Sequence, residues 1–211
     1  MNDVQKLARV ISRKFGNVKP RHDYGWFEPA LDVLDCVLSL NRRYDSFVVP
    51  RIKNFRDRNP KITGLKQLLR LIKKYRTPLA FSKAELQYNH KERAETLLAV
   101  VCYLIKVQRK FNKKSERARL QAWARFVKPT DYKELEIAGF GLAGFQYLRM
   151  LFGVQTTKPD IHIKRFVSEV VGYKVNELTS LTLLEQAAKQ EHLLLREVDG
   201  AIWRSRARKR K

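Results

Sequence analysis

Apolar residues recur at spacings of three and four along almost the entire chain, and this pattern limits the possible folds more than any other feature. Residues 28–40 (EPALDVLDCVLSL) and 64–75 (GLKQLLRLIKKY) both follow it, and it is typical of amphipathic helices. Pro29 stands in what would be a first turn, where proline is tolerated. Only residues 45–50 (DSFVVP) resemble a strand, and they are too few to build a sheet. The pattern therefore predicts an all-α protein.

Helical patterns continue through the rest of the chain, with no long linker or internal repeat between them. Two of them meet near Asn89, and others cover residues 114–127, 178–189 and 191–203. The last eight residues, RSRARKRK, include six basic side chains, which is too much charge for a packed segment. We therefore expect one domain over residues 1–203, followed by a disordered basic tail over residues 204–211.

Lysine and arginine outnumber aspartate and glutamate by 44 to 21, and the formal net charge is +23. This excess favours a polyanionic partner such as DNA, RNA or an anionic membrane surface. No apolar run approaches the roughly 20 residues that span a bilayer. The N-terminal segment also lacks the apolar core and cleavage site of a secretory signal. We therefore expect an intracellular protein, in which Cys36 and Cys102 are reduced thiols in the core.

A glycine-rich turn at residues 137–141 (IAGFG) joins two helical patterns. Gly139, Gly141 and Gly144 leave the backbone without side chains where the second helix begins. Main-chain amides at such a position, aided by the helix dipole, can bind a phosphate oxygen. A tight turn between packed helices would explain the same residues, because Gly-x-Gly is a common sequence.

A second motif, PDIHIKR, follows the turn by about twenty residues. Together the two motifs resemble the signature of the helix-hairpin-helix DNA glycosylases, in which Leu-Pro-Gly-Val-Gly is followed by Val-Asp-Thr-His-Val-x-Arg. Asp160, His162 and Arg165 match that signature in register. Ala138 replaces the proline of the turn, and Ile161 replaces the usual threonine.

The resemblance implies a chemical role for Asp160. In these enzymes positive charge builds on the sugar as the base leaves, and a carboxylate beside C1′ stabilises that charge and can activate water. Asp160 holds the matching position. It would also serve as the N-cap of a helix over residues 161–171, and we expect it to do both. His162 and Arg165 are expected to fix that helix rather than to react.

The resemblance also implies a reaction subtype. Members that cleave the DNA strand carry a nucleophilic lysine two residues beyond the last glycine of the turn. Ala143 stands at that position, so the implied enzyme is monofunctional and leaves an abasic site. Lys158 or Lys164 could supply an amine instead, although neither holds the family position.

Members of this family can carry an iron–sulfur cluster or a monovalent cation. The iron–sulfur members carry a set of cysteines near the C-terminus, and this chain has only two cysteines in all. We therefore expect no cluster. Some members also bind a monovalent cation at main-chain carbonyls of the turn, which here correspond to those of Leu135, Ile137 and Phe140.

Extruding a base from the helix leaves a gap, which these enzymes fill with a side chain. Asn41 holds the family position of such a wedge, and Tyr88 and Asn89 hold the position of a second. The alternatives are a helix-end cap for Asn41 and a packing aromatic for Tyr88. Candidate walls of the base pocket are Trp26, Phe27 and Tyr44, at least one of which could instead pack in the core. Candidate phosphate contacts are Arg42, Arg43, Arg51 and Lys53.

Weaker matches at residues 37–45 and 88–101 extend the resemblance over roughly residues 28–200. It implies two helical lobes with a DNA-binding cleft. About residues 37–140 would form the lobe with the turn, and the two ends of the chain would form the other. The implied partner is damaged double-stranded DNA, bound by a monomer. Alkylated, oxidised, deaminated and crosslinked bases all remain open as the lesion.

Two other functions fit part of the sequence. A non-catalytic helix-hairpin-helix protein that binds DNA or RNA would keep the turn and the charge, but it would not need Asp160. A basic ribosome-associated protein would explain the charge and the tail, but not the spacing from Gly141 to Asp160.

Overall fold

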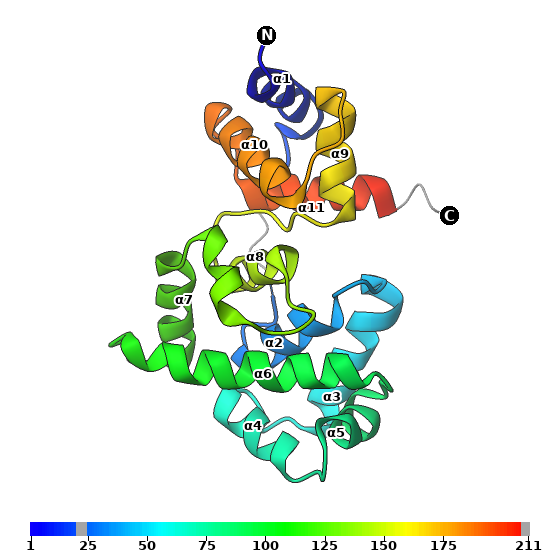
Figure 1. Ribbon diagram of the computed structural model, residues 1–211, viewed down its shortest axis with the longest axis vertical. Coiled ribbons are helices and arrows are strands. Elements are labelled where there is room, and N and C mark those ends of the chain that lie inside the picture. Colours follow the sequence, from blue (N-terminus) through cyan, green and yellow to red (C-terminus); the bar gives the residue numbers. More distant parts are fainter. Residues whose placement is uncertain (20–24, 208–211) are drawn as a thin grey trace. The chain divides into compact units, whose positions relative to one another are not determined.

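The computed structural model describes residues 1–19 and 25–207, and every regular element within them is helical. The predicted all-α class is therefore confirmed. In this part of the chain, none of the helices is long and apolar enough to pass through a bilayer. The chain divides into two compact units (Figure 1): Met1–His22 with Val154–Lys211, and Asp23–Gly153.

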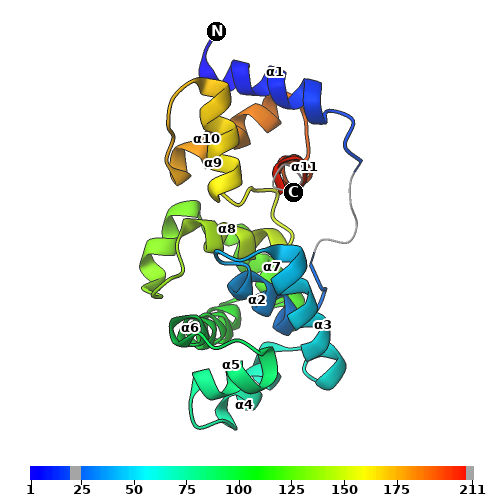
Figure 2. The ribbon, with the colours of Figure 1, turned by 90° about the vertical axis from the view of Figure 1, so that its right-hand side faces the viewer.

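The first unit joins the two ends of the chain in one core. Its helices are α1 (Asp3–Phe15), α9 (Ile161–Val171), α10 (Glu177–Gln190) and α11 (Leu195–Ala207). Figure 2 shows α1 lying across α9 and α10, the two helices on which it chiefly packs. The shared core draws buried side chains from all of these helices.

The sequence of α1 explains this packing. Leu7, Ala8 and Ile11 lie on one face of the helix and are fully buried. Asn2 caps the first turn by accepting a hydrogen bond from the Gln5 amide (2.9 Å), and the Gln5 side chain accepts one from the Asn2 amide (3.1 Å). A reciprocal cap of this kind stabilises a helix by about 1 kcal/mol.

The second unit surrounds α2 (Pro29–Leu38), all of whose residues are buried. Its other helices are α3 (Val49–Arg58), α4 (Leu65–Lys73), α5 (Pro78–Leu86), α6 (Lys91–Val107), α7 (Glu116–Phe126) and α8 (Leu142–Leu151). Helix α2 packs against α3, α4, α6 and α8. A helix that is apolar nearly all round is expected in the interior. Asp32 and Asp35 are buried with the rest of α2, and buried carboxyl groups require hydrogen-bond partners.

Residues 45–50 do not form a strand. Tyr44–Val48 forms a π-helical turn that continues directly into α3. Pro50 lies in the first turn of α3, where a missing amide costs no helical hydrogen bond. The unit also extends beyond the expected residues 37–140, because both α2 and α8 belong to it.

Two other predictions need correction. The expected disordered tail begins at Arg204, but α11 continues to Ala207, and Arg206 forms a double ion pair with Glu169 of α9. Residues 208–211 lie outside the described part of the chain. Cys36 is buried as predicted, whereas Cys102 is exposed, because it lies on the outer face of α6.

Candidate functional site

Asp160 is the N-cap of α9, as the sequence predicts. Its Oδ1 accepts hydrogen bonds from the main-chain amides of His162 (2.8 Å) and Ile163 (3.2 Å). None of the described residues donates to Oδ2, and the side chain is half-buried. One carboxylate oxygen is therefore anchored by the backbone, and the other is available to a ligand.

Asp199 of α11 is a carboxyl that interacts electrostatically with Asp160, and it is not among the predicted site residues. It is buried, and its Oδ2 accepts hydrogen bonds from the Thr157 hydroxyl and from the Lys158 amide (2.9 Å). Burial, with the negative charge of Asp160 as a further cause, raises the pKa of Asp199 to about 7. Asp199 thus holds the segment that leads into Asp160.

A signal for Asp199 was present in the sequence. It lies on the same stripe of α11 as Leu195, Val198 and Ile202, which are buried apolar residues. A carboxyl on such a stripe must be protonated or hydrogen-bonded, because burying an unpaired charge is costly. Of the neighbouring candidates in α9, His162 is half-buried and Arg165 is exposed.

The turn at residues 137–141 follows a 3₁₀ helix (Pro129–Leu135) and leads into α8. Gly139 has a φ of +72°, a conformation that favours glycine. Gly141 is the exposed N-cap of α8, and a Cβ placed there would meet no atom within 4 Å. Packing within the protein does not demand glycine at this position, whereas a ligand approaching the backbone would.

Two side chains of α6 hold this turn in place. Thr96 Oγ1 lies 2.8 Å from both the Ala138 and the Glu92 carbonyl oxygens, and its single proton can be donated to either of them. Arg93 Nη1 donates one to the Gly139 carbonyl at 3.0 Å. The guanidinium group therefore adds a fixed positive charge to the turn. That charge would favour an anion near the amides at the start of α8.

The same guanidinium group disfavours a monovalent cation at this turn. The carbonyls predicted to hold that cation belong to Leu135, Ile137 and Phe140, and the Ile137 carbonyl already accepts the Phe140 amide at 3.1 Å. A cation there would lie close to the positive charge of Arg93, which bonds the carbonyl of the residue before Phe140. Elsewhere in the described residues, no group of three or more His, Cys, Asp or Glu side chains could hold a metal ion.

Gly144 has a packing role within the protein. It is buried, and a Cβ there would lie 3.0 Å from the Phe140 ring and 3.1 Å from the Leu40 side chain. Its carbonyl accepts a hydrogen bond from the thiol of Cys36 (3.3 Å). Glycine at this position lets α8 approach its neighbours closely.

Two of the predicted pocket aromatics, Trp26 and Tyr44, meet at Asp35, which is not among the predicted site residues. The carboxylate of Asp35 accepts hydrogen bonds from Trp26 Nε1 (2.8 Å), the Tyr44 hydroxyl (2.7 Å) and the Tyr147 hydroxyl (2.8 Å). Burial, together with the negative charge of Asp35, raises the pKa of Tyr44 and of Tyr147. These side chains form a satisfied polar cluster in the second unit.

Asp32, one turn earlier on α2, is also satisfied. It accepts hydrogen bonds from the Trp26 amide (2.7 Å) and from Arg117 Nη1 (2.7 Å). Burial raises the pKa of Asp32 to about 6, against the opposing effects of these two donors. Phe27 remains 54% exposed, with the guanidinium of Arg117 at 5.1 Å from its ring centre. It could therefore contact a ligand.

The predicted wedge residues lie in two different environments. Asn41 is exposed with a φ of +59°, which asparagine tolerates well. Asn89 is exposed as well. Tyr88 is only 8% exposed and packs edge-on against Phe47. This placement supports the alternative of a packing aromatic for Tyr88 and leaves the two asparagines accessible.

Basic residues cluster around these aromatics. The guanidinium of Arg42 lies 5.5 Å from the Tyr88 ring centre, and that of Arg51 lies 3.8 Å from the Phe47 ring centre. Arg51 also donates hydrogen bonds to the Phe47 and Gln87 carbonyls, so its charge is partly committed to the fold. The remaining predicted phosphate contacts, Arg43 and Lys53, are exposed.

The structure thus brings together the predicted Trp26 and Tyr44 in the second unit, and it places Asp160 beside the unpredicted Asp199 in the first. In comparisons with known proteins, no curated protein and no solved structure matches the chain. A family model matches residues 5–207, and the protein therefore belongs to the family described as Domain of unknown function (DUF8548).

Proposed function

We propose that this protein is a monofunctional DNA glycosylase, which removes a damaged base from double-stranded DNA and leaves an abasic site. The proposal starts from the resemblance of the two motifs around Gly139 and Asp160 to the helix-hairpin-helix glycosylases. The net charge of +23 suits a nucleic-acid partner. The protein would act on DNA as a monomer.

The half-anchored carboxylate of Asp160 carries the proposal. Two backbone amides fix Oδ1, while Oδ2 receives no hydrogen bond from any described residue. A structural N-cap needs only the first of these oxygens. The second would be held in a fixed position with its negative charge uncompensated by a hydrogen bond, as stabilisation of a cation requires.

The reaction would proceed through cleavage of the bond between C1′ and the base nitrogen. The bonding electrons leave with the base, and positive charge develops over C1′ and the ring oxygen of the sugar. The carboxylate of Asp160 would stabilise this charge. Water would then add to C1′ and give its proton to that carboxylate or directly to the departing base, which leaves as the neutral base. Ala143 has no amine to attack C1′, so no imine would form at the family position.

Other residues would support binding rather than chemistry. The amides near Gly139 and Gly141, with the charge of Arg93 beside them, would contact a phosphate. Arg42, Arg43 and the exposed Asn41 would contact the strand or fill the gap left by the base. Phe27 and Trp26 are the aromatic candidates for contact with the base. The proposed mechanism uses no metal and no iron–sulfur cluster.

A panel of duplexes tests the proposal, each labelled at one end and carrying one alkylated, oxidised, deaminated or crosslinked base. After incubation with the protein, at least one duplex should break only when treated with hot alkali, which reveals an abasic site. Borohydride should trap no covalent adduct. Strand breakage without alkali, or a trapped adduct, would instead point to an amine nucleophile such as Lys158 or Lys164.

The alternative function is a nucleic-acid-binding protein without chemistry, which the charge of +23 would equally support. The same panel separates the two functions. Tight binding to the duplexes with no abasic site in any of them would favour the non-catalytic protein. Faster excision than in a protein-free control would exclude it.

A further inference from the structure

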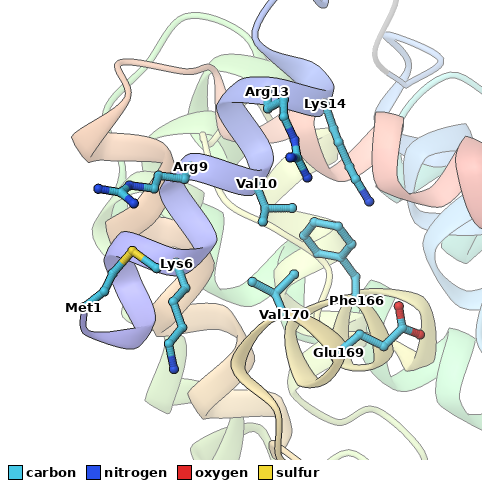
Figure 3. Close-up of a pocket in the computed structure, with 9 residues that line it drawn as sticks. All are labelled: Met1, Lys6, Arg9, Val10, Arg13, Lys14, Phe166, Glu169 and Val170. Atoms are coloured by element: carbon cyan, nitrogen blue, oxygen red, sulfur yellow. The ribbon is translucent and has the colours of Figure 1, made fainter.

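An open cavity of about 680 Å³ lies between α1 and α9, within the first unit. Figure 3 shows Val10 of α1 facing Phe166 and Val170 of α9 across its base, with Arg13 and Lys14 extending from α1 toward Phe166. The cavity therefore has an apolar base and a basic rim. None of these residues belongs to the candidate site around Asp160.

The positive charge of the rim is not neutralised within the described protein. Arg9, Arg13 and Lys14 form no ion pair with any acidic residue among residues 1–19 and 25–207. Glu169 lines the cavity too, but it is paired with Arg206 of α11. Arg9, Arg13 and Lys14 lie within about one and a half turns of α1. The cavity is therefore suited to an anionic ligand.

An anionic membrane surface is a poor match for this region. Helices that lie in a bilayer interface insert an exposed apolar face, whereas α1 buries Leu7, Ala8 and Ile11 in the core. Of the apolar residues at the base of the cavity, Phe166 is only 4% exposed, and Val10 and Val170 are half-buried. The ligand must therefore reach into the cavity with an apolar part while its charge stays at the rim.

An unpaired nucleotide of a nucleic-acid strand meets both requirements. Proteins that bind single strands place bases against apolar or aromatic surfaces and phosphates against lysine and arginine. Arginine is well suited to phosphate because its planar group can form two parallel hydrogen bonds. Duplex DNA would satisfy the rim alone, because its bases are stacked inside the helix and cannot reach Val10 or Val170.

We propose that the cavity between α1 and α9 binds an unpaired nucleotide of a nucleic-acid strand. Its base packs against the half-buried Val10 and Val170, beneath which Phe166 forms the buried floor of the cavity, and the adjoining phosphates bind Arg9, Arg13 and Lys14. This site rests on the nucleic-acid binding of the proposed function, but not on base excision. It would give the protein an affinity for single-stranded segments that is independent of any lesion.

The rim is tested with a fluorescent 12-nucleotide strand of thymidines and the triple variant Arg9→Gln/Arg13→Gln/Lys14→Gln of the full chain. Fluorescence anisotropy at a series of salt concentrations should show at least about a ten-fold loss of affinity. The slope of log affinity against log salt should fall by about 2, because each phosphate contact in a single strand contributes about 0.7.

The matched control removes the same charge from the exposed face of α4, in Lys66→Gln/Arg70→Gln/Lys73→Gln. It should lose less than about three-fold in affinity. Equal losses in the two triple variants would overturn the proposal, because net charge alone would then explain the binding. The proposal would also be wrong if phosphatidylserine vesicles bound the protein through the same three residues and competed with the strand.

The apolar base is tested with a second 12-nucleotide strand in which every base is missing. It carries the same phosphates, so the wild type should bind the thymidine strand several-fold more tightly only if bases make contact. The double variant Val10→Thr/Val170→Thr keeps the shape of both side chains and should lose most of this preference. Equal affinity of the wild type for the two strands, or a preference unchanged in the double variant, would contradict the proposed site.

These binding results can be separated from the outcome for the proposed function. If no lesion were excised but the rim and base variants behaved as expected, the cavity would stand and the glycosylase proposal would fail. If excision were observed but both sets of variants bound normally, the glycosylase proposal would stand and the cavity proposal would fail.

Discussion

Each of the two units contains a pair of neighbouring carboxyl groups, and the two pairs differ in how completely the protein satisfies them. In the second unit Asp35 accepts three hydrogen bonds, and Asp32 binds an amide and the guanidinium of Arg117. In the first unit both described donors to Asp199 bind its Oδ2, and both described donors to Asp160 bind its Oδ1, so each carboxyl keeps one oxygen without a described donor. A closed pair serves the fold, whereas an oxygen left open is available for chemistry.

The largest effect on folding should come from the closed pair. Asp35→Ala leaves the buried donors of Trp26, Tyr44 and Tyr147 without their acceptor, and each loss costs about 1–3 kcal/mol. We expect the free energy of unfolding to fall by about 3–5 kcal/mol in urea titrations followed by circular dichroism. The exposed Asp45 provides a control, since Asp45→Ala should change the free energy of unfolding by less than about 0.5 kcal/mol. A small effect of Asp35→Ala would mean that this pair is not structural.

The pH dependence of stability should distinguish the two pairs. The pKa of Asp199 is raised to about 7 and that of Asp32 to about 6. A carboxyl with a raised pKa binds more protons in the folded than in the unfolded protein, so stability falls as the pH rises from about 4 to the folded pKa. Between pH 6 and pH 7, Asp199 therefore contributes most of the dependence of stability on pH, with a slope of up to about 1.4 kcal/mol per pH unit, while the contribution of Asp32 fades over the same range.

Urea titrations at intervals from pH 5 to pH 8 measure this slope. In Asp199→Asn, the fall in the free energy of unfolding between pH 6 and pH 7 should largely disappear. In Asp32→Asn, most of that fall should remain, and the free energy of unfolding should depend less on pH below pH 6. An unchanged slope between pH 6 and pH 7 in Asp199→Asn would show that the carboxyl is not protonated in the folded protein at neutral pH.

Two glycines at the start of α8 differ in a similar way, because Gly144 is packed against other side chains and Gly141 is not. Gly144→Ala would press a methyl group against Phe140 and Leu40. Overpacking costs about 1–3 kcal/mol, and the better helix propensity of alanine offsets about 1 kcal/mol of it. We expect a net loss of about 1 kcal/mol in the free energy of unfolding, with little effect on DNA affinity.

Gly141→Ala should show the opposite pattern. A methyl group there meets no protein atom within 4 Å, so stability should change by less than about 1 kcal/mol. If a phosphate approaches this backbone, the affinity for duplex DNA should fall several-fold. Unchanged affinity in Gly141→Ala would mean that the turn at residues 137–141 has no role in binding.

Local features of the structure could be predicted from the sequence, because their causes lie within a few residues. The three- and four-residue spacing predicted the helices, and PDIH predicted that Asp160 would cap α9. The failures have long-range causes. Asp35 takes its donors from Trp26, Tyr44 and Tyr147, which no local pattern joins.

Two further failures have the same origin. The packing role of Gly144 was not predicted, because its neighbour Leu40 lies far away in the sequence. The tail was predicted to be disordered from Arg204 because of its charge, but α11 continues to Ala207. Arg206 forms an ion pair there with Glu169 of α9, which is distant in the sequence. The role assigned to Asp160 in catalysis remains a prediction of the motif.

Asp160→Asn tests the central claim most directly, because asparagine can keep the Oδ1 cap of α9 while the charge on Oδ2 is lost. Single-turnover excision should be measured on the best substrate of the lesion panel, beside DNA affinity and the free energy of unfolding. We expect the rate to fall by about 10²–10³ or more, with affinity and stability close to those of the wild type. Excision at the wild-type rate by Asp160→Asn would contradict the account, because the open oxygen would then have no chemical role.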